Sequence, residues 1–210
     1  MNTTTSSTVC DDQDDSLLPW PDHSIRVFQD GSLWGIHGLD MLEAWELYAE
    51  GYRRAAEALS EDRANSCSTY LLFPMAFLYR HYVELRLKHM LFVSLEYPGL
   101  PPPPNGWRLN HNLKETWNLV LPRLLAASGG LPKVELDNVT RLIEELHDKD
   151  PGAFVFRYPT SRSGDEWLSD PALDINSLDV NNYFKSMRQL SESLDIMSGC
   201  MHEVVRQRNA

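Results

Sequence analysis

The chain has 210 residues, 42% of them hydrophobic and 23% charged, which is the composition of one soluble globular domain with a core of its own. Its formal net charge of −11 argues against broad binding to a nucleic-acid backbone, because such binding needs clustered lysine and arginine. The three cysteines are widely spaced and show no metal-site spacing, and the chain has neither a secretory signal nor an uninterrupted apolar span. We therefore expect a cytoplasmic protein without a membrane helix.

The N-terminal part of the chain differs in composition from the rest. Residues 1–18 are rich in Thr, Ser and Asp, which predicts a disordered acidic tail. Residues 19–38 place large aromatic side chains among proline and glycine, namely Trp20, Phe28 and Trp34. We expect this stretch to be irregular and to pack its aromatic rings on the body of a single helical domain, residues 19–210.

Two helices are predicted next. The first begins at Leu39 and ends near Ser60, because apolar residues there repeat at steps of four and three, as in a heptad. Its seam consists of Met41, Trp45, Tyr48, Tyr52, Ala55 and Leu59. The second helix spans Leu71 to Leu95, with Pro74 in an early turn or at a kink. Its N-cap is expected among three hydroxyl residues, Ser66, Ser68 and Thr69.

A proline-rich connection separates the second helix from the third. The stretch from Tyr97 to Trp107 cannot be helical and is expected to be stiff and extended. The third helix begins at about His111, and Gly129 and its glycine neighbour end it. Pro122 inside it predicts a kink or a break.

The last part of the chain predicts two further helices and one short arm. A fourth helix follows Pro132 and stops before Pro151. The alternating, aromatic segment Phe154–Pro159 is expected to be an extended arm or one edge of a small hairpin. The last helix runs from Val180 to about Arg206, with apolar residues at steps of three and four throughout. The whole pattern predicts an all-α bundle of about five helices.

Charged side chains interrupt the second helix at its centre. They are Arg80, His81, Glu84 and Lys88, and they fall within about a third of the helix circumference. Because that face is apolar at both ends, the charges are expected to face the interior or a cleft. Buried charge is costly unless it is paired, so partners should come from elsewhere in the chain. The candidate partners are His111, Asp148, Asp150 and Arg157.

Two interpretations of this centre remain open. In the functional one, a pocket binds an anion such as a phosphate or an RNA backbone through Arg80, His81, Glu84, Lys88, His111 and Arg157. In the structural one, Glu84 and Asp150 neutralise the cations, and the ion network stabilises the bundle. The two differ in whether the cations cluster at an open surface.

A ribonuclease interpretation depends on a different pair. Cleavage through the 2′-hydroxyl needs a group that moves a proton near neutral pH and a fixed cation that stabilises the phosphorane. Arg141 and His147 in the fourth helix are such a pair, and His81 is a further acid–base candidate. Alternatively, Arg141 pairs with Glu145 and His147 interacts with the helix C-terminus. No phosphate loop, nucleophile elbow or complete zincin motif occurs, so neither a cofactor nor a metal site is expected.

Three motifs together resemble bacterial proteins of the HEPN-like class. They are RHYVELRLK (Arg80 to Lys88), HNL (His111 to Leu113) and FRYP (Phe156 to Pro159), and the resemblance covers about Leu39 to Arg206. It implies a helical bundle, often dimeric, in antiviral defence or toxin–antitoxin settings. Many members are metal-independent endoribonucleases with an Arg–x4–6–His motif at a dimer interface. Here that motif maps onto Arg141 and His147, with Leu142 where the family has a polar residue.

The leading hypothesis is therefore a cytoplasmic HEPN-like protein that acts on or binds RNA, as a homodimer. Arg80, Lys88, His111 and Arg157 would bind phosphate, and an antitoxin or another protein would be its partner. The competing hypothesis is a non-catalytic helical interaction or oligomerisation module, in which the charged centre is structural. A third hypothesis is a sensor of a nucleotide or small anion in the same pocket.

Overall fold

The computed structural model describes residues 39–66, 70–97, 101–161, 163–164, 166 and 179–209. The predicted tail (1–18) and the aromatic segment (19–38) lie outside these residues. The described part contains five α-helices and no strand: α1 (Met41–Ser66), α2 (Leu72–Val93), α3 (Leu113–Ser128), α4 (Lys133–Lys149) and α5 (Val180–Asn209). Two single-turn 3-10 helices occur at Ser94–Glu96 and Trp107–Leu109. The all-α prediction is thus confirmed for this part of the chain.

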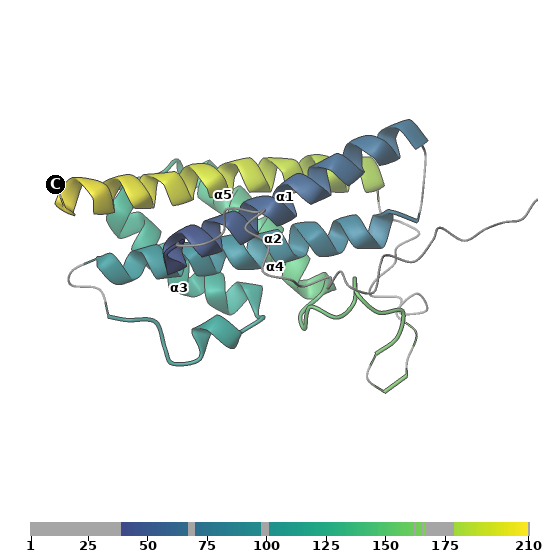
Figure 1. Cartoon of the computed structure of the whole chain (residues 1–210), viewed down its shortest axis with the longest axis horizontal. Coiled ribbons are helices and arrows are strands. Elements are labelled where there is room, and N and C mark those ends of the chain that lie inside the picture. Colours follow the sequence, from purple (N-terminus) through teal and green to yellow (C-terminus); the bar gives the residue numbers. More distant parts are fainter. Residues whose placement is uncertain are drawn as a thin grey trace, which may run out of the picture. The chain divides into compact units, whose positions relative to one another are not determined.

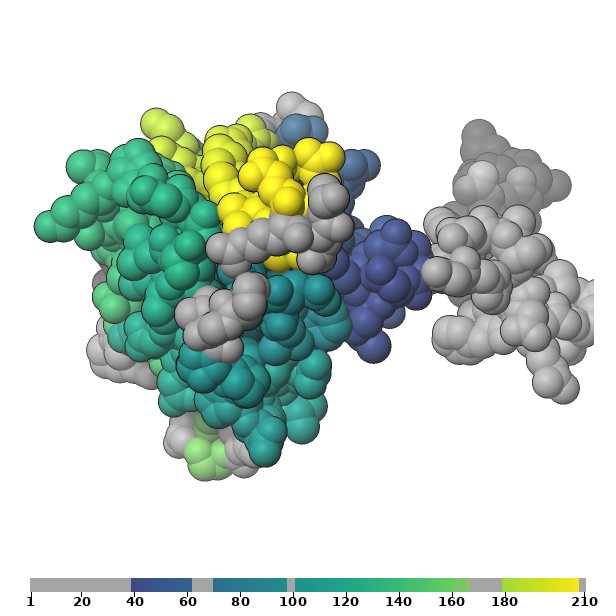
Figure 2. All heavy atoms as spheres, turned by 90° about the vertical axis from the view of Figure 1, so that its left-hand side faces the viewer, coloured from purple at the N-terminus to yellow at the C-terminus, as the bar shows by residue number. Residues whose placement is uncertain are grey.

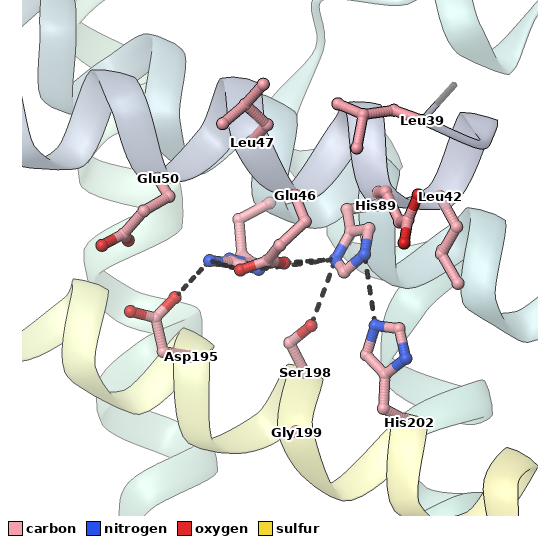
Figure 3. A pocket seen from close by; sticks show the side chains of 12 residues that line it. Leu39, Leu42, Glu46, Leu47, Glu50, His89, Asp195, Ser198, Gly199 and His202 are labelled. Carbon is pink, nitrogen blue, oxygen red and sulfur yellow. Dashed lines mark hydrogen bonds and ion pairs between the residues drawn. The ribbon is translucent and has the colours of Figure 1, made fainter. Parts of the chain in front are cut away.

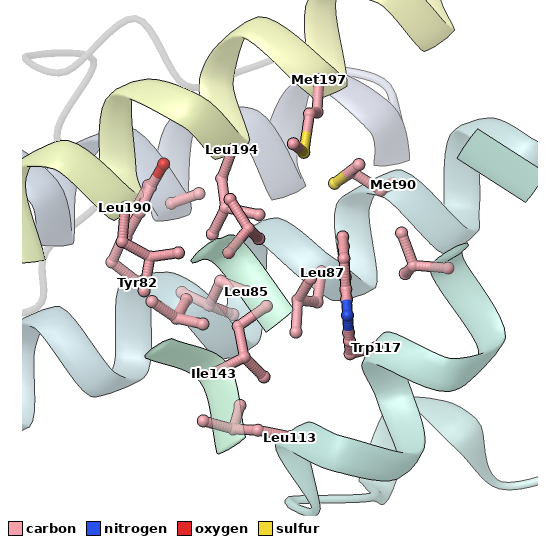
Figure 4. Packing of buried hydrophobic residues seen from close by; sticks show 14 of the residues in the cluster. Tyr82, Leu85, Leu87, Met90, Leu113, Trp117, Ile143, Leu190, Leu194 and Met197 are labelled. Atoms are coloured by element: carbon pink, nitrogen blue, oxygen red, sulfur yellow. The ribbon is translucent and has the colours of Figure 1, made fainter. Parts of the chain in front are cut away.

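The helix α2 lies at the centre of the fold. It contacts α1, α3 and α5, and Figure 1 shows α1, α2 and α5 running lengthwise beside one another. Its apolar residues are spread around the whole circumference, as in a helix that is buried on all sides. Figure 4 shows α2 side chains such as Leu87 and Met90 packed against Trp117 of α3, Ile143 of α4 and Leu194 of α5.

Local sequence signals explain most of the helix ends. The side chain of Asn112 caps α3 by accepting a hydrogen bond from the backbone N–H of Glu115 (3.1 Å). Gly129 ends α3 in a left-handed conformation, with φ of 63°, that favours glycine. Asp40 and Glu43 form a reciprocal pair of side chain to backbone bonds, 2.8 and 3.0 Å, at the start of α1.

Three details of the sequence prediction need correction. α1 continues to Ser66, beyond the expected end near Ser60, and Leu71 stands at the N-cap of α2 without a side-chain bond. Of the expected N-cap residues, Ser66 therefore belongs to α1, while Ser68 and Thr69 lie outside the described residues. α3 is continuous through Pro122, so this proline does not split the helix.

The predicted extended FRYP arm is a turn. The backbone N–H groups of Arg157 and Tyr158 both donate to the carbonyl of Phe154, at 3.0 Å each, which reverses the chain. The Asp150 carboxylate holds the start of this turn, because it accepts the backbone N–H groups of Phe154 (2.7 Å) and Val155 (3.0 Å). An isolated antiparallel bridge between Thr160 and Glu166 follows. These local bonds outweigh the alternating pattern that suggested a strand.

None of the helices in the described residues combines the length and apolarity that crossing a membrane requires.

Candidate functional site

The charged residues at the centre of α2 form a buried ion network, which we call the central charge cluster (Arg80, Glu84, Lys88, His111 and Asp150). Arg80 Nη1 lies 2.7 Å from one Glu84 carboxylate oxygen, and Lys88 Nζ lies 2.8 Å from the other. The side chains of Arg80, Glu84 and Lys88 are only 1%, 2% and 4% exposed. Spacing of four on α2 brings the three together, as predicted from sequence.

Two distant segments complete this cluster. His111, just before α3, places Nδ1 2.8 Å from a Glu84 oxygen, and its backbone carbonyl accepts a bond from Arg80 Nη2 (2.7 Å). Asp150, just after α4, places a carboxylate oxygen 3.6 Å from Arg80 Nε. The other candidate partner, Asp148, pairs with Lys114 instead, at 2.6 Å.

The charges of the central charge cluster balance internally. Burial alone would raise the pKa of Glu84, but the hydrogen bonds and charges of Lys88 and Arg80 outweigh it and hold that pKa at about 2. Two buried cations thus face two buried carboxylates, and the half-exposed His111 is the one member of the cluster that reaches the surface. Arg80 and Lys88 direct their charge at groups of the chain itself, which is the arrangement of a structural ion network.

Arg157 and His81 lie apart from this network, among aromatic rings. Arg157 donates through Nε to the carbonyl of Ala153, and its guanidinium lies 5.7 Å from the ring centre of Phe77. His81 stacks on Phe77 at 5.6 Å and meets Tyr52 of α1 edge-on at 4.4 Å. Burial lowers the pKa of His81, so the imidazole is neutral at pH 7.

The motif residues Arg141 and His147 do not converge within one chain. Six residues apart on α4, they are separated by about 120° around the axis and about 9 Å along it. Arg141 pairs with Glu145 at 2.7 Å on the exposed side of the helix. His147 has a buried Nδ1 without a hydrogen-bond partner among the described residues. Burial, then the charge of Lys114, lowers the pKa of His147, and Arg80 adds to the effect.

A second polar site occurs on the opposite side of α2, which we call the α1–α2–α5 groove. It has a volume of about 790 Å³ and an open mouth. It is lined by Leu39, Leu42, Glu43, Glu46, Leu47, Glu50, Arg86, His89, Asp195, Ser198, Gly199 and His202. Figure 3 shows His89 between Ser198 and His202 of α5, with Glu46 of α1 opposite them.

Arg86 joins the three helices in the groove. Its guanidinium bonds both carboxylate oxygens of Glu46 on α1 and lies 2.8 Å from Asp195 on α5. The hydroxyl of Tyr82 donates to the same Asp195 oxygen at 2.7 Å. A buried arginine with two carboxylate partners fixes the relative positions of the helices that carry them.

His89 forms the fully buried end of the groove. Its Nε2 lies 3.2 Å from Nε2 of His202, and its Nδ1 lies 3.3 Å from the hydroxyl of Ser198 and 3.4 Å from Arg86 Nη1. Burial lowers the pKa of His89 to about 4, and the Arg86 and His202 charges act in the same direction, against Glu46. The same Nδ1 lies 3.4 Å from a carboxylate oxygen of Glu46, so it meets a donor of Arg86 and an acceptor of Glu46 at equal distance.

This groove was not predicted from the sequence. A signal was present, because Asp195, Ser198 and His202 follow each other at steps of three and four beside the apolar seam of α5. On α2, Arg86 and His89 face away from the central charge cluster. Apolar residues occur on all sides of α2. The spacing of its apolar residues therefore does not indicate that charged and polar residues occupy two different faces at its centre.

Comparison with known proteins identifies no relative. No family model, curated protein or solved structure matches this chain. Within the described residues, no three histidine, cysteine or acidic side chains are placed to hold a metal ion. The function must therefore be inferred from the two polar sites and from the surface of the helices.

Proposed function

We propose that this protein is a helical interaction module that self-associates through one face of α1. The observation that carries the proposal is an uncharged, partly exposed face on that helix. Between Met41 and Leu59 all charged residues of α1 fall within about 100° of its circumference. The remaining face contains Met41, Ala44, Trp45, Tyr48, Gly51, Tyr52 and Ala55, and we call it the α1 face.

Large apolar side chains on the α1 face are accessible to a partner. Met41 is 62% exposed and Tyr48 is 61% exposed. Together with Ala44, Trp45 and Leu85 of α2 they surround a shallow hollow of about 240 Å³. In Figure 2 the first turns of α1, in purple, stand at the surface of the body. Exposed apolar residues that repeat as a heptad are typical of a helix that packs against another helix.

Gly51 supports close approach of a second helix to this face. A glycine inside a helix costs about 1 kcal/mol relative to alanine. No atom lies within 4 Å of the position that a Cβ of Gly51 would occupy, so packing within the described chain does not require a glycine there. A partner backbone lying over this position would require it, because small residues let helices come close together.

The α1 face is the place where a second copy of this protein would meet the least charge repulsion. Two molecules of net charge −11 repel each other, and contact is least unfavourable where the surface carries no charge. A two-fold dimer buries the same patch of both subunits, so the patch must be compatible with itself. The uncharged, heptad-spaced α1 face meets that condition.

Sedimentation velocity of the full chain tests this proposal. We expect the wild type to sediment as a dimer at micromolar concentration and Tyr48→Lys to sediment as a monomer, because the charge is placed in the contact. Tyr70→Lys is the matched control, since Tyr70 is 90% exposed and lies outside the α1 face. A monomeric wild type, or equal behaviour of the two variants, would refute self-association through α1.

A second candidate function is RNA binding or metal-independent RNA cleavage by a cytoplasmic HEPN-like protein in defence. The observation that favours it is the gathering of imidazoles and cations where α3 begins and α4 ends. His111 is half-exposed there, and Lys114 and Arg80 both act on the pKa of His147. A dimer would be needed to bring Arg141 of one copy to His147 of another. RNA would be the ligand, and an antitoxin a further partner.

Incubation of the purified protein with total RNA in the absence of metal tests the second candidate. Cleavage that is lost in Arg141→Ala and in His147→Ala would support it. Loss in Arg80→Ala alone would instead place the activity at the central charge cluster. If the wild type neither cuts nor binds RNA, the enzymatic hypothesis is refuted and the self-association proposal is unaffected.

A further inference from the structure

The α1–α2–α5 groove has the size and lining of a small-molecule site. Its volume of about 790 Å³ lies within the range of ligand pockets in proteins, roughly 300 to 1,000 Å³. One edge is apolar, formed by Leu42 and Leu47 of α1 and by Leu39 just before that helix. The opposite wall is polar and carries the histidine pair on α2 and α5. Such a division suits an amphipathic ligand with an apolar body and one polar end.

The net charge around the groove determines whether the polar end of the ligand is a cation or an anion. Four carboxylates line it, on Glu43, Glu46, Glu50 and Asp195, against the single cation Arg86. Including the neighbouring ion-pair partners Arg53, Arg54 and Glu57 still leaves an excess of negative charge. The histidine pair adds no positive charge at pH 7, because burial keeps the pKa of His89 and of His202 below the ordinary value. A cation is attracted and an anion is repelled.

Gly199 keeps the groove open. It lies inside α5, where glycine is unfavourable, and no atom lies within 4 Å of the position of an added Cβ. Nothing that packs in the described chain therefore explains the glycine. Any longer side chain at this position would project into the space that the groove offers to a ligand.

We propose that the α1–α2–α5 groove binds a small organic cation with an apolar body, such as an alkylammonium or arylalkylammonium compound. The apolar body lies along Leu39, Leu42 and Leu47. The ammonium group lies near the partly exposed carboxylate of Glu46, whose charge Arg86 only partly offsets. This site is independent of the α1 face, because the residues that line it occupy the other side of α1.

Isothermal titration of the full chain with hexylammonium tests the proposal. Two probes of equal chain length serve as controls, namely neutral 1-hexanol and anionic hexanoate. Gly199→Leu fills the groove, and Gly199→Ala adds only one carbon, so the pair separates occlusion from any general effect of replacing the glycine. Both substitutions favour the helix, so both variants are expected to fold. Circular dichroism and the urea midpoint of each variant verify this.

We expect saturable binding of hexylammonium by the wild type and by Gly199→Ala, weakened at least about tenfold in Gly199→Leu. Hexanol should bind more weakly and hexanoate should not bind. Tyr48→Lys should bind hexylammonium like the wild type, since it alters only the α1 face. The proposal is overturned if the wild type shows no binding up to about 10 mM, if hexanoate binds equally well, or if Gly199→Leu binds unchanged.

Discussion

At the scale of single residues, the two polar sites differ in what their charges do. Arg80 and Lys88 are buried and pair with the buried Glu84. Glu46, which pairs with the buried Arg86, is half-exposed at the α1–α2–α5 groove. Spacing of four on one helix was enough to predict the first group. Whether that group would be open or sealed depended on His111 and Asp150, which come from segments 31 and 70 residues away.

Removing the Glu84 charge should destabilise the fold strongly. Glu84→Gln leaves Arg80 and Lys88 buried without their shared anion, at a cost of about 3–5 kcal/mol in the free energy of unfolding. Glu145→Gln is the control, because it breaks only the exposed pair with Arg141 and should change stability by less than about 0.5 kcal/mol. Urea unfolding at pH 7 measures both. Equal stability of the two variants would contradict a structural role for the cluster.

Glu84 also predicts a loss of stability in acid. Its folded pKa of about 2 lies below the ordinary 4.5, so the unfolded chain binds the proton more tightly. The stabilisation is complete above pH 4.5 and is lost as the pH falls from 4.5 towards 2. Glu84→Gln should show a shallower decline than the wild type in that window.

The lowered pKa of His89 predicts a second range of pH, above that of Glu84, in which the free energy of unfolding depends on pH. The pKa of His89 is about 4 in the folded chain and ordinarily 6.5, so the unfolded chain binds the proton more tightly. The free energy of unfolding is therefore highest above pH 6.5 and decreases as the pH falls from 6.5 to 4. The difference corresponds to about 3 kcal/mol. His89→Gln should flatten the dependence of the urea midpoint on pH between 6.5 and 4. An unchanged slope would show that His89 is protonated equally in the folded and unfolded chains.

At the scale of elements, helix positions follow closely from the apolar period and the stop signals. α5 was expected from Val180 to about Arg206 and extends from Val180 to Asn209. Its seam is buried, with Met187, Leu190 and Leu194 at the core. The seam of α1 has the same spacing, but Met41 and Tyr48 are exposed and only Trp45, Tyr52 and Leu59 are partly buried against the core. Period alone does not distinguish the two, because it reports that a helix has an apolar side and not what covers it.

Replacing Gly199 or Gly129 by alanine should have opposite effects on stability, because the two glycines differ in backbone conformation. Gly199 is helical with open space around it, so Gly199→Ala should raise the free energy of unfolding by up to about 1 kcal/mol. Gly129 has φ of 63°, so Gly129→Ala should lower it by about 1 kcal/mol. Thermal unfolding of the two variants beside the wild type measures the difference. A stabilised Gly129→Ala would contradict the left-handed end of α3.

At the scale of the whole molecule, the net charge and the α1 face have opposite effects on self-association. The charge of −11 opposes association of two copies, and the apolar face favours it. This balance makes self-association dependent on salt, since screening weakens repulsion but leaves apolar contact intact.

Self-association should therefore strengthen as salt is added. We expect the dimer dissociation constant to fall between 20 mM and 500 mM sodium chloride, with the Debye length shortening from roughly 20 Å to roughly 4 Å. Sedimentation equilibrium at several salt concentrations measures it. A dimer that weakens with salt would mean that ion pairs, rather than the uncharged α1 face, form the contact.

The sequence alone determined the helical class and the approximate helix ends, because these depend on local period, capping and proline or glycine signals. It also brought Arg80, Glu84 and Lys88 together, since one helix carries all three. Only the tertiary structure decided that this cluster is sealed, that Arg157 lies among aromatic rings, and that Arg86 and His89 open onto a groove with His202. These are contacts between segments far apart in the chain. A helix that is apolar on every side carries no local signal of which neighbour covers which face.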